Sequence, residues 1–348
     1  MAKQQTYREK TDAHYNEKAE QIKEKLPRFL DNYYNYISEL AASSKHEYIS
    51  DLYFFFDWIK ADPKYNDYTL KDLPFEAFKE LTYDDLMNYL KEYEPNKNSK
   101  ESSRSRKLAS IKSVYKYFST IKAIDTNPAS LIAIKVPVKS EDEKIFLQPN
   151  EVANLLDCID KGSGMEKLGG RKEAWRKVNR TRDLAILTTL LGTGIRVSEL
   201  VGLNTTDVDF ENGALHIIRK GRKKGIVYMG DEVTAALTGY INNGRAYYQP
   251  AEDEKALFLS LKHKRLAVRS VEDLLKKYVE AAIPYRADEK ISPHKMRSTF
   301  ATSLYNDTGD IKLVADAIGH TNISTTQRYY AATNPEIKRS AFTRVQLR

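Results

Sequence analysis

Residues 182–200 of the chain read RDLAILTTLLGTGIRVSEL. The first ten of these residues are mostly apolar, which predicts a buried helix over 182–191. The glycines that follow, Gly192 and Gly194, suggest the beginning of a GxGxxG dinucleotide loop. Val197 occupies the position of the third glycine, however, and a helix rather than a strand precedes the loop. A nucleotide-binding fold is therefore not expected, and the sequence also contains no GxxxxGK phosphate loop followed by Ser or Thr.

Downstream of this stretch the pattern changes to two short β-runs, residues 214–218 and 226–229. A turn with the sequence RKGRKKG joins them, which predicts a hairpin with a basic tip. Such closely spaced cations repel one another unless an anion binds beside them. Taken alone, the turn is compatible with a solvated β-turn and with a finger that contacts phosphate. After Asp231 the chain is expected to be helical, with breaks near Pro250, Pro284 and Pro293.

Upstream, apolar residues recur with helical spacing and predict an all-helical domain over 26–133. Residues 1–25 are polar and charged, and are expected to form an N-terminal tail that is either helical or disordered. Little periodicity remains over 134–148, which predicts an interdomain linker. The second domain is expected over 149–333, and residues 334–348 are expected to form a short amphipathic docking helix. Within the second domain, a helix begins at Pro149, and residues 161–180 are expected to form a long loop.

Composition bounds the possible functions of the 348-residue chain. Lys and Arg total 56 against 48 Asp and Glu, a net charge of +8 that is compatible with a nucleic-acid partner. The single cysteine, Cys158, excludes an internal disulfide and a cysteine-based zinc site. We expect no membrane segment and no secretory signal, because no apolar run is long enough, and therefore a cytoplasmic location. The six histidines lack metal-binding spacing, so no metal and no cofactor are expected.

Two further polar clusters carry chemistry. A histidine and an arginine lie three residues apart at an expected helix start, and a tyrosine lies nine residues after a second histidine. Each cluster alone has an ordinary explanation as surface or packing. Together with the first arginine and the hairpin lysine they form one candidate set: Arg196, Lys220, His294, Arg297, His320 and Tyr329. Two guanidiniums neutralise phosphate oxygens, a phenol attacks phosphorus, and a lysine protonates the leaving 5′ oxygen, so the set predicts metal-free attack on a phosphodiester.

The runs that contain these residues resemble the three catalytic boxes of the tyrosine recombinase (phage integrase) family. They read TGIRVSEL over 193–200, HKMR over 294–297, and IGH over 318–320 with STTQRY over 324–329. The resemblance spans about 182–333. It implies that Arg196 and Arg297 hold the scissile phosphate. It also implies the remaining roles: Lys220 as general acid, His294 and His320 as hydrogen-bonding groups that assist proton transfer, Tyr329 as nucleophile and Glu199 as support for the first arginine.

Two departures accompany this resemblance, Ile318 in place of the commoner leucine and a second tyrosine, Tyr330, beside the expected nucleophile. The implied fold is mainly α. An all-helical core-binding domain precedes a mixed, mainly α catalytic domain with a small antiparallel hairpin. The layout looks most similar to the Xer recombinases that act alone in streptococci and their relatives. Chromosome-dimer resolution and mobile-element integration both stay open.

The resemblance also implies the partners. These are double-stranded DNA with a specific, palindromic site and three further protomers, since a Holliday-junction exchange between two sites needs four cuts. The DNA-binding candidates are Arg104, Arg106, Lys107, Lys112, Arg219, Arg222, Lys223 and Lys224. A topoisomerase IB-like nicking-closing enzyme is one alternative. A non-catalytic DNA-binding relative is the other, and it is disfavoured because all six polar positions are intact.

Overall fold

A computed structural model describes residues 6–91, 101–135, 146–165, 170–320, 322–323 and 326, apart from the side chains of 170, 172–174 and 220. The chain divides into two compact units, Met1–Val138 and Lys139–Arg348. The division falls within the segment 134–148, for which the sequence predicts a linker. Each unit is described by itself.

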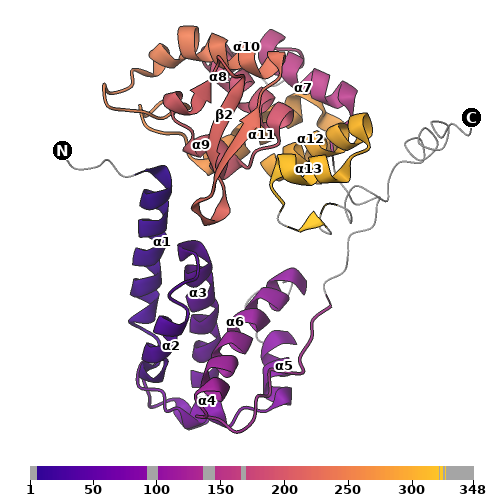
Figure 1. The fold of residues 1–348 in the computed structure, drawn as a ribbon. Helices are drawn as coiled ribbons and strands as arrows, with labels where there is room; N and C mark the ends of the chain where they lie inside the picture. Colours follow the sequence, from indigo (N-terminus) through magenta and orange to yellow (C-terminus); the bar gives the residue numbers. More distant parts are fainter. Residues whose placement is uncertain are drawn as a thin grey trace, which may run out of the picture. The chain divides into compact units, whose positions relative to one another are not determined.

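The described residues of the first unit form helices joined by turns and loops (Figure 1). Its α-helices are α1 (Tyr7–Lys23), α2 (Asp31–Tyr36), α3 (Ala42–Lys60), α4 (Glu76–Lys79), α5 (Tyr83–Lys91) and α6 (Glu101–Thr120). Two short 3-10 helices, η1 (Arg28–Leu30) and η2 (Pro63–Tyr65), complete it. The core is aromatic: the ring of Phe78 stacks on that of Tyr115 with centroids 4.3 Å apart, an arrangement that adds to the stabilisation from burial.

Helix α1 extends the helical unit beyond the predicted start at residue 26. It begins with a capping box, in which the Thr6 hydroxyl accepts from the Glu9 N–H at 3.2 Å while the Glu9 carboxylate accepts from the Thr6 N–H at 2.7 Å. Ala19 is fully buried, and α1 lies along α3 (Figure 1). Over 7–23 the expected tail is therefore a helix packed into the bundle.

The second unit is mainly helical and is built around α8. Its α-helices are α7 (Pro149–Lys161), α8 (Gly170–Thr193), α9 (Val197–Gly202), α10 (Asp231–Gly239), α11 (Val268–Ala282), α12 (Pro293–Thr308) and α13 (Ile311–Ile318). The shorter turns are η5 (Thr205–Asp207), η6 (Lys220–Arg222), η7 (Tyr240–Gly244), η8 (Arg245–Tyr248) and η9 (Pro284–Glu289). Helices α7, α10 and α12 all contact α8. The predicted apolar segment 182–191 is the buried C-terminal half of α8.

Two expectations for this unit are wrong. The loop predicted over 161–180 ends at Gly170, where α8 begins. The polar residues there are satisfied by distant partners: Arg176 is buried and donates to the Ile159 carbonyl at 2.9 Å, and Asn179 accepts from the Tyr248 hydroxyl at 2.8 Å. The stretch from Pro250 to Ala267 is not helical, and contains isolated bridges such as that between Leu259 and Arg265.

A three-stranded antiparallel sheet in the order β1-β2-β3 carries the hairpin. The strands are β1 (Val208–Asp209), β2 (Ala214–Ile218) and β3 (Lys224–Tyr228). Ala214 pairs with Tyr228 and Ile218 with Lys224, so β3 begins two residues before its predicted start. The predicted fold class, mainly α with a small antiparallel sheet, is confirmed. Among the described helices, none is both long and apolar enough to cross a membrane.

Candidate active site

The first motif forms a tight loop between α8 and α9. Gly194 has a φ of +61°, and a Cβ there would lie 2.3 Å from Cδ1 of Phe300 on α12. A Cβ on Gly192 would lie 2.5 Å from Cγ2 of Val233. Close packing therefore explains both glycines. The result is that α12 approaches the backbone just before Arg196.

Arg196 stands at the N-terminus of α9 and is fixed by Glu199. The Glu199 carboxylate accepts from the Arg196 backbone N–H with one oxygen and from Nη1 with the other, both at 2.8 Å. The carboxylate side chain is 3% exposed and the arginine side chain is 36% exposed. Glu199 thus satisfies a helix-terminal N–H and orients the guanidinium with the same group. The structure brings together this pair, which the resemblance implies.

Arg297 connects the three motifs. It lies on α12, is 4% exposed, and donates from Nη1 to the Gly194 carbonyl at 2.5 Å. Its Nη2 donates to the carbonyl of Ile318, the last residue of α13. A single buried guanidinium therefore joins the loop of the first motif, the helix of the second and the helix end of the third.

His320 follows α13 directly. Gly319 ends the helix in the left-handed conformation, with φ of +61°, and the His320 N–H donates to the Ala315 carbonyl at 2.9 Å. The Nδ1 atom of His320 lies in hydrogen-bonding contact, 2.9 Å, with Oγ1 of the buried Thr326. Burial lowers the pKa of His320 to about 4, and the charges of Arg297 and Arg196 act in the same direction. The imidazole is consequently neutral at pH 7.

His294 occupies the first turn of α12, one residue after Pro293. Its side chain is exposed to solvent on one side, but neighbouring atoms partly desolvate the ring, and this desolvation lowers the pKa of His294. The charges of Lys295, Arg297 and Arg196 lower the pKa further. The same two arginines act on both histidines, and His294 acts on His320. Four of the six predicted polar residues, Arg196, His294, Arg297 and His320, thus lie in one electrostatic environment, which favours an anion.

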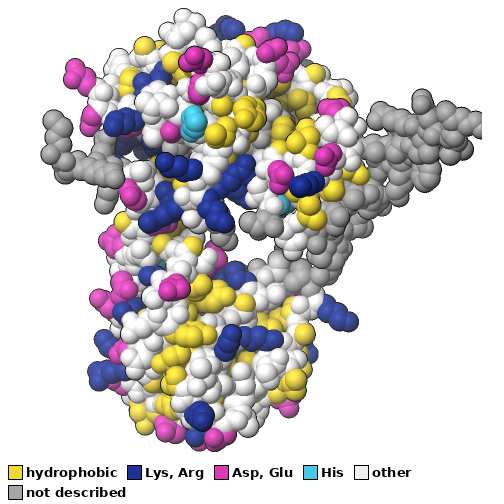
Figure 2. Space-filling model, viewed as in Figure 1, with side chains coloured by type: hydrophobic (Ala, Val, Ile, Leu, Met, Phe, Trp, Pro, Cys, Tyr) yellow, Lys and Arg dark blue, Asp and Glu magenta, His cyan; other side chains and the backbone are white. Residues whose placement is uncertain are grey.

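The hairpin turn places basic residues on the surface of the same unit. Arg222, Lys223 and Lys224 are exposed. Figure 2 shows Lys and Arg side chains gathered on the edge of this unit where Figure 1 places the turn below β2. Arg219 differs from them, because its Nη2 donates to the Ala317 carbonyl at 3.1 Å. The backbone of Lys220 lies in η6, and its side chain is outside the described residues.

Some DNA-binding candidates in the first unit have partners within that unit. Arg106 pairs with the buried carboxylate of Asp51, and Arg104 lies 3.0 Å from a carboxylate oxygen of Glu101. The Nζ of Lys112 donates to the Ser130 carbonyl at 3.4 Å. Burial raises the pKa of Asp51, and hydrogen bonding and the charge of Arg106 oppose this rise. Arg106 therefore has a structural part in neutralising a buried acid. Lys107, the fourth of these candidates, is half-buried on α6.

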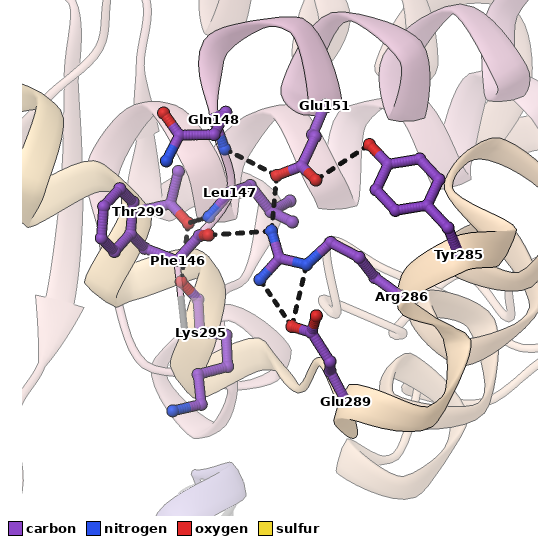
Figure 3. A network of polar contacts seen from close by, with 9 residues as sticks. All are labelled: Phe146, Leu147, Gln148, Glu151, Tyr285, Arg286, Glu289, Lys295 and Thr299. Atoms are coloured by element: carbon purple, nitrogen blue, oxygen red, sulfur yellow. Dashed lines mark hydrogen bonds and ion pairs between the residues drawn. The ribbon is translucent and has the colours of Figure 1, made fainter. Parts of the chain in front are cut away.

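A second polar network, which sequence reasoning missed, anchors the first described residues of the second unit to α12 (Figure 3). The Leu147 N–H donates to the Thr299 hydroxyl, which donates to the Lys295 carbonyl, both at 2.9 Å. Arg286 donates to the Phe146 carbonyl at 3.1 Å and to Glu151 at 2.5 Å. The only sequence signal was the threonine two residues after Arg297. This network holds the helix that carries His294 and Arg297.

Several predicted elements lie outside the described residues. They are Tyr329, Tyr330 and the C-terminal segment 334–348. Where the chain is described, no group of three or more His, Cys, Asp or Glu residues is placed to hold a metal ion.

Comparison with known proteins agrees with this geometry. The Phage integrase family matches residues 146–336. Tyrosine recombinase XerC of Caldanaerobacter subterraneus subsp. tengcongensis is 31% identical over 329 residues, covering 90% of this chain and 86% of the relative. Tyrosine recombinase XerS of Streptococcus pyogenes is 29% identical, with coverages of 92% and 96%.

A solved structure shares the fold. The Tn1549 transposon integrase in complex with circular intermediate DNA has a TM-score of 0.64 at 19% identity, over 89% of this chain and 96% of that one. The family match covers more than half of the chain, and the XerC relative passes 30% identity over most of both lengths. The chain therefore belongs to the phage integrase family, as an Xer-like tyrosine recombinase, an enzyme of the kind that breaks and rejoins DNA.

Proposed function

We propose that this enzyme recombines DNA at a specific site through a covalent phosphotyrosine intermediate. The observation that carries the proposal is the pair of hydrogen bonds from Arg297 to the Gly194 and Ile318 carbonyls. These bonds gather Arg196, His294 and His320 around one buried guanidinium. A cluster of cationic and neutral nitrogen donors suits a phosphodiester.

In the cleavage step, the phenol oxygen of Tyr329 forms a bond to phosphorus, and the bond from phosphorus to the 5′ oxygen breaks. The phenol proton passes to His320, whose low pKa keeps the imidazole neutral and able to accept it. Lys220 gives a proton to the leaving 5′ oxygen. Arg196 and Arg297 stabilise the charge on the non-bridging oxygens as it builds up.

Rejoining reverses these bonds. A 5′ hydroxyl from the other duplex attacks the phosphotyrosine, the phenol leaves, and the protons return to their original groups. One phosphodiester is exchanged for another, so the reaction needs no nucleotide hydrolysis. Two such rounds produce and resolve a Holliday junction. We assign the reaction to the cytoplasm, where chromosomal DNA is accessible to the enzyme.

The partner is double-stranded DNA with a palindromic site, bound by four protomers across two sites. The exposed cations Arg222, Lys223 and Lys224 support phosphate binding at the hairpin. The structure of the Tn1549 transposon integrase, which shares the fold, is a complex with circular intermediate DNA. We assign the C-terminal segment 334–348 to docking on a neighbouring protomer, because the sequence spacing of its apolar residues Ile337, Ala341 and Phe342 predicts a stripe on a helix, and so short a helix would need a surface that buries this stripe.

A nicked suicide substrate tests the reaction. After cleavage, the short fragment between the cleavage site and the nick carries the free 5′ hydroxyl and diffuses away. Rejoining is then impossible, so the covalent protein–DNA adduct accumulates and is seen as a band of reduced mobility on a denaturing gel. Wild-type protein and the Tyr330→Phe variant should form the adduct, and Tyr329→Phe should not. Adduct formation by Tyr329→Phe together with its loss in Tyr330→Phe would move the nucleophile to Tyr330.

A further inference from the structure

Arg219 extends from the base of the hairpin turn to the C-terminal end of α13. Its Nη2 donates to the Ala317 carbonyl at 3.1 Å. A Cβ on Gly319 would lie 1.4 Å from Arg219 Nη1, and a Cβ on Gly225 would lie 2.7 Å from Nε. The guanidinium therefore lies against two glycines, one on each element, in a space that any other residue type would fill.

The end of α13 receives two arginines side by side. Arg219 bonds the carbonyl of Ala317, and Arg297 bonds that of the next residue, Ile318. The last carbonyls of a helix have no partner within the helix and carry the negative end of its dipole, so cations are favoured there. Arg219 and Arg297 together fix the segment that leads into His320.

The other end of Arg219 fixes the turn. Its backbone N–H donates to the Lys223 carbonyl at 2.7 Å, which closes the turn around Lys220. Gly221 and Arg222 both have positive φ, 77° and 60°, so the turn is tight. Lys220 follows Arg219 directly in the sequence, and its backbone position depends on this closure.

We propose that Arg219 is a positioning residue that holds the turn bearing Lys220 against the segment bearing His320. It acts through a backbone carbonyl rather than through DNA phosphate, in contrast to its sequence-based assignment as a DNA-binding candidate. This inference rests on the proposed function, in which Lys220 is the general acid. Loss of Arg219 leaves phosphate binding in place and impairs protonation of the leaving oxygen.

A substrate with sulfur in place of the bridging 5′ oxygen isolates this step. A thiolate leaves without being protonated, so the sulfur substrate needs no general acid. We measure single-turnover cleavage of the oxygen and sulfur substrates at saturating DNA for the wild type and for Arg219→Ala, Arg219→Lys and Lys220→Ala.

Arg219→Ala should slow cleavage of the oxygen substrate by about 10–100-fold, which is at or below the lower end of what a general acid contributes, because Lys220 is displaced rather than removed. On the sulfur substrate, Arg219→Ala should cleave at a rate within about threefold of the wild type. Arg219→Lys should stay slow on oxygen, because an ammonium lacks the planar fork that lies between the two glycines. A slow rate on both substrates would overturn the inference, since that result indicates general loss of the site.

Two comparisons separate this inference from the proposed function. If Lys220→Ala is not rescued by sulfur, the general-acid assignment fails. If Lys220→Ala is rescued and Arg219→Ala is not, only the positioning role of Arg219 fails.

Binding provides the matched control. Arg222→Ala, at the exposed tip, should weaken DNA binding and reduce the slope of log affinity against log salt by about 0.9. Arg219→Ala should leave that slope unchanged. A reduced slope for Arg219→Ala would show that Arg219 contacts phosphate, and would overturn the inference.

A variant on the facing strand tests the contact itself. Gly225→Ala places a methyl group against Arg219 without requiring a positive φ. Gly225→Ala alone should slow cleavage of the oxygen substrate. Added to Arg219→Ala it should have no further effect on the cleavage rate, because the effects of substitutions at contacting residues are not additive. Fully additive effects would contradict the contact.

Discussion

The guanidinium of Arg297 donates to the carbonyl of Gly194 at 2.5 Å, across 103 positions of sequence. This bond ties α12 to the loop that leads into Arg196. Because Arg297 is buried and also bonds the end of α13, its loss leaves two carbonyls without this donor. The residue that is expected to hold phosphate therefore also holds the site together.

Arg196→Ala and Arg297→Ala should consequently differ in stability although both abolish cleavage. Each removes transition-state stabilisation on the order of 3 kcal/mol or more. Arg297→Ala should in addition lower the free energy of unfolding by about 1–3 kcal/mol, whereas the partly exposed Arg196 should change it by less than about 1 kcal/mol. Urea unfolding and the suicide-substrate assay measure the two effects. Equal stabilities would contradict the structural role of Arg297.

Glu199→Gln should lower the cleavage rate by misplacing Arg196. The amide keeps one oxygen, but its NH₂ group cannot accept a hydrogen bond, so either the Arg196 N–H or its Nη1 loses its partner. We expect a loss of about tenfold in single-turnover rate at saturating DNA. Glu199→Asp serves as the control, because aspartate keeps the negative charge but its side chain is one methylene shorter. An unchanged rate in both variants would show that Arg196 needs no such support.

Glu151 should make the protein less stable in acid. Its burial alone would raise its pKa, but hydrogen bonds from the Gln148 N–H and Tyr285 and the charge of Arg286 outweigh burial and lower the pKa (Figure 3). A lowered pKa in the folded state stabilises the protein above the unfolded value of 4.5, and this stability is lost as the pH falls through the folded pKa.

Glu151→Gln should therefore cost about 1–3 kcal/mol at pH 7 and remove the part of the acid dependence below pH 4.5 that Glu151 causes. Urea unfolding between pH 3 and pH 7 provides the measurement. A variant that retains the full wild-type slope below pH 4.5 would exclude Glu151 as its source.

His320 should give a separate pH window. Its folded pKa of about 4 lies below the ordinary value of 6.5, so the unfolded chain binds a proton first as the pH falls. The stabilisation is complete above pH 6.5 and is lost as the pH falls towards 4. Nuclear magnetic resonance titration should find His320 neutral at pH 6, and a bound phosphodiester should raise its pKa. A pKa of His320 near 6.5 in the DNA-free protein would contradict its burial beside Arg297 and Arg196.

The sequence predicted what depends on local pattern and missed what depends on distant partners. The apolar run 182–191, the hairpin and the α12 start at Pro293 follow from spacing and from proline. The N-terminal half of α8 was missed because Arg176 and Asn179 look like loop residues until their buried partners are known. In the sequence, Arg219 looks like one more DNA-binding cation of the basic turn, because its structural partner, Ala317, lies 98 residues away and leaves no local signal.

The central claim is that cleavage links Tyr329 to DNA, and mass spectrometry of the adduct tests it most directly. The covalent complex is digested with nuclease and then with trypsin, which cuts after Arg328 and Lys338 and releases YYAATNPEIK. We predict that this peptide carries a nucleotide and that fragmentation places the phosphate on its first residue, Tyr329. Phosphate on the second residue, Tyr330, or on a different peptide, would contradict the account.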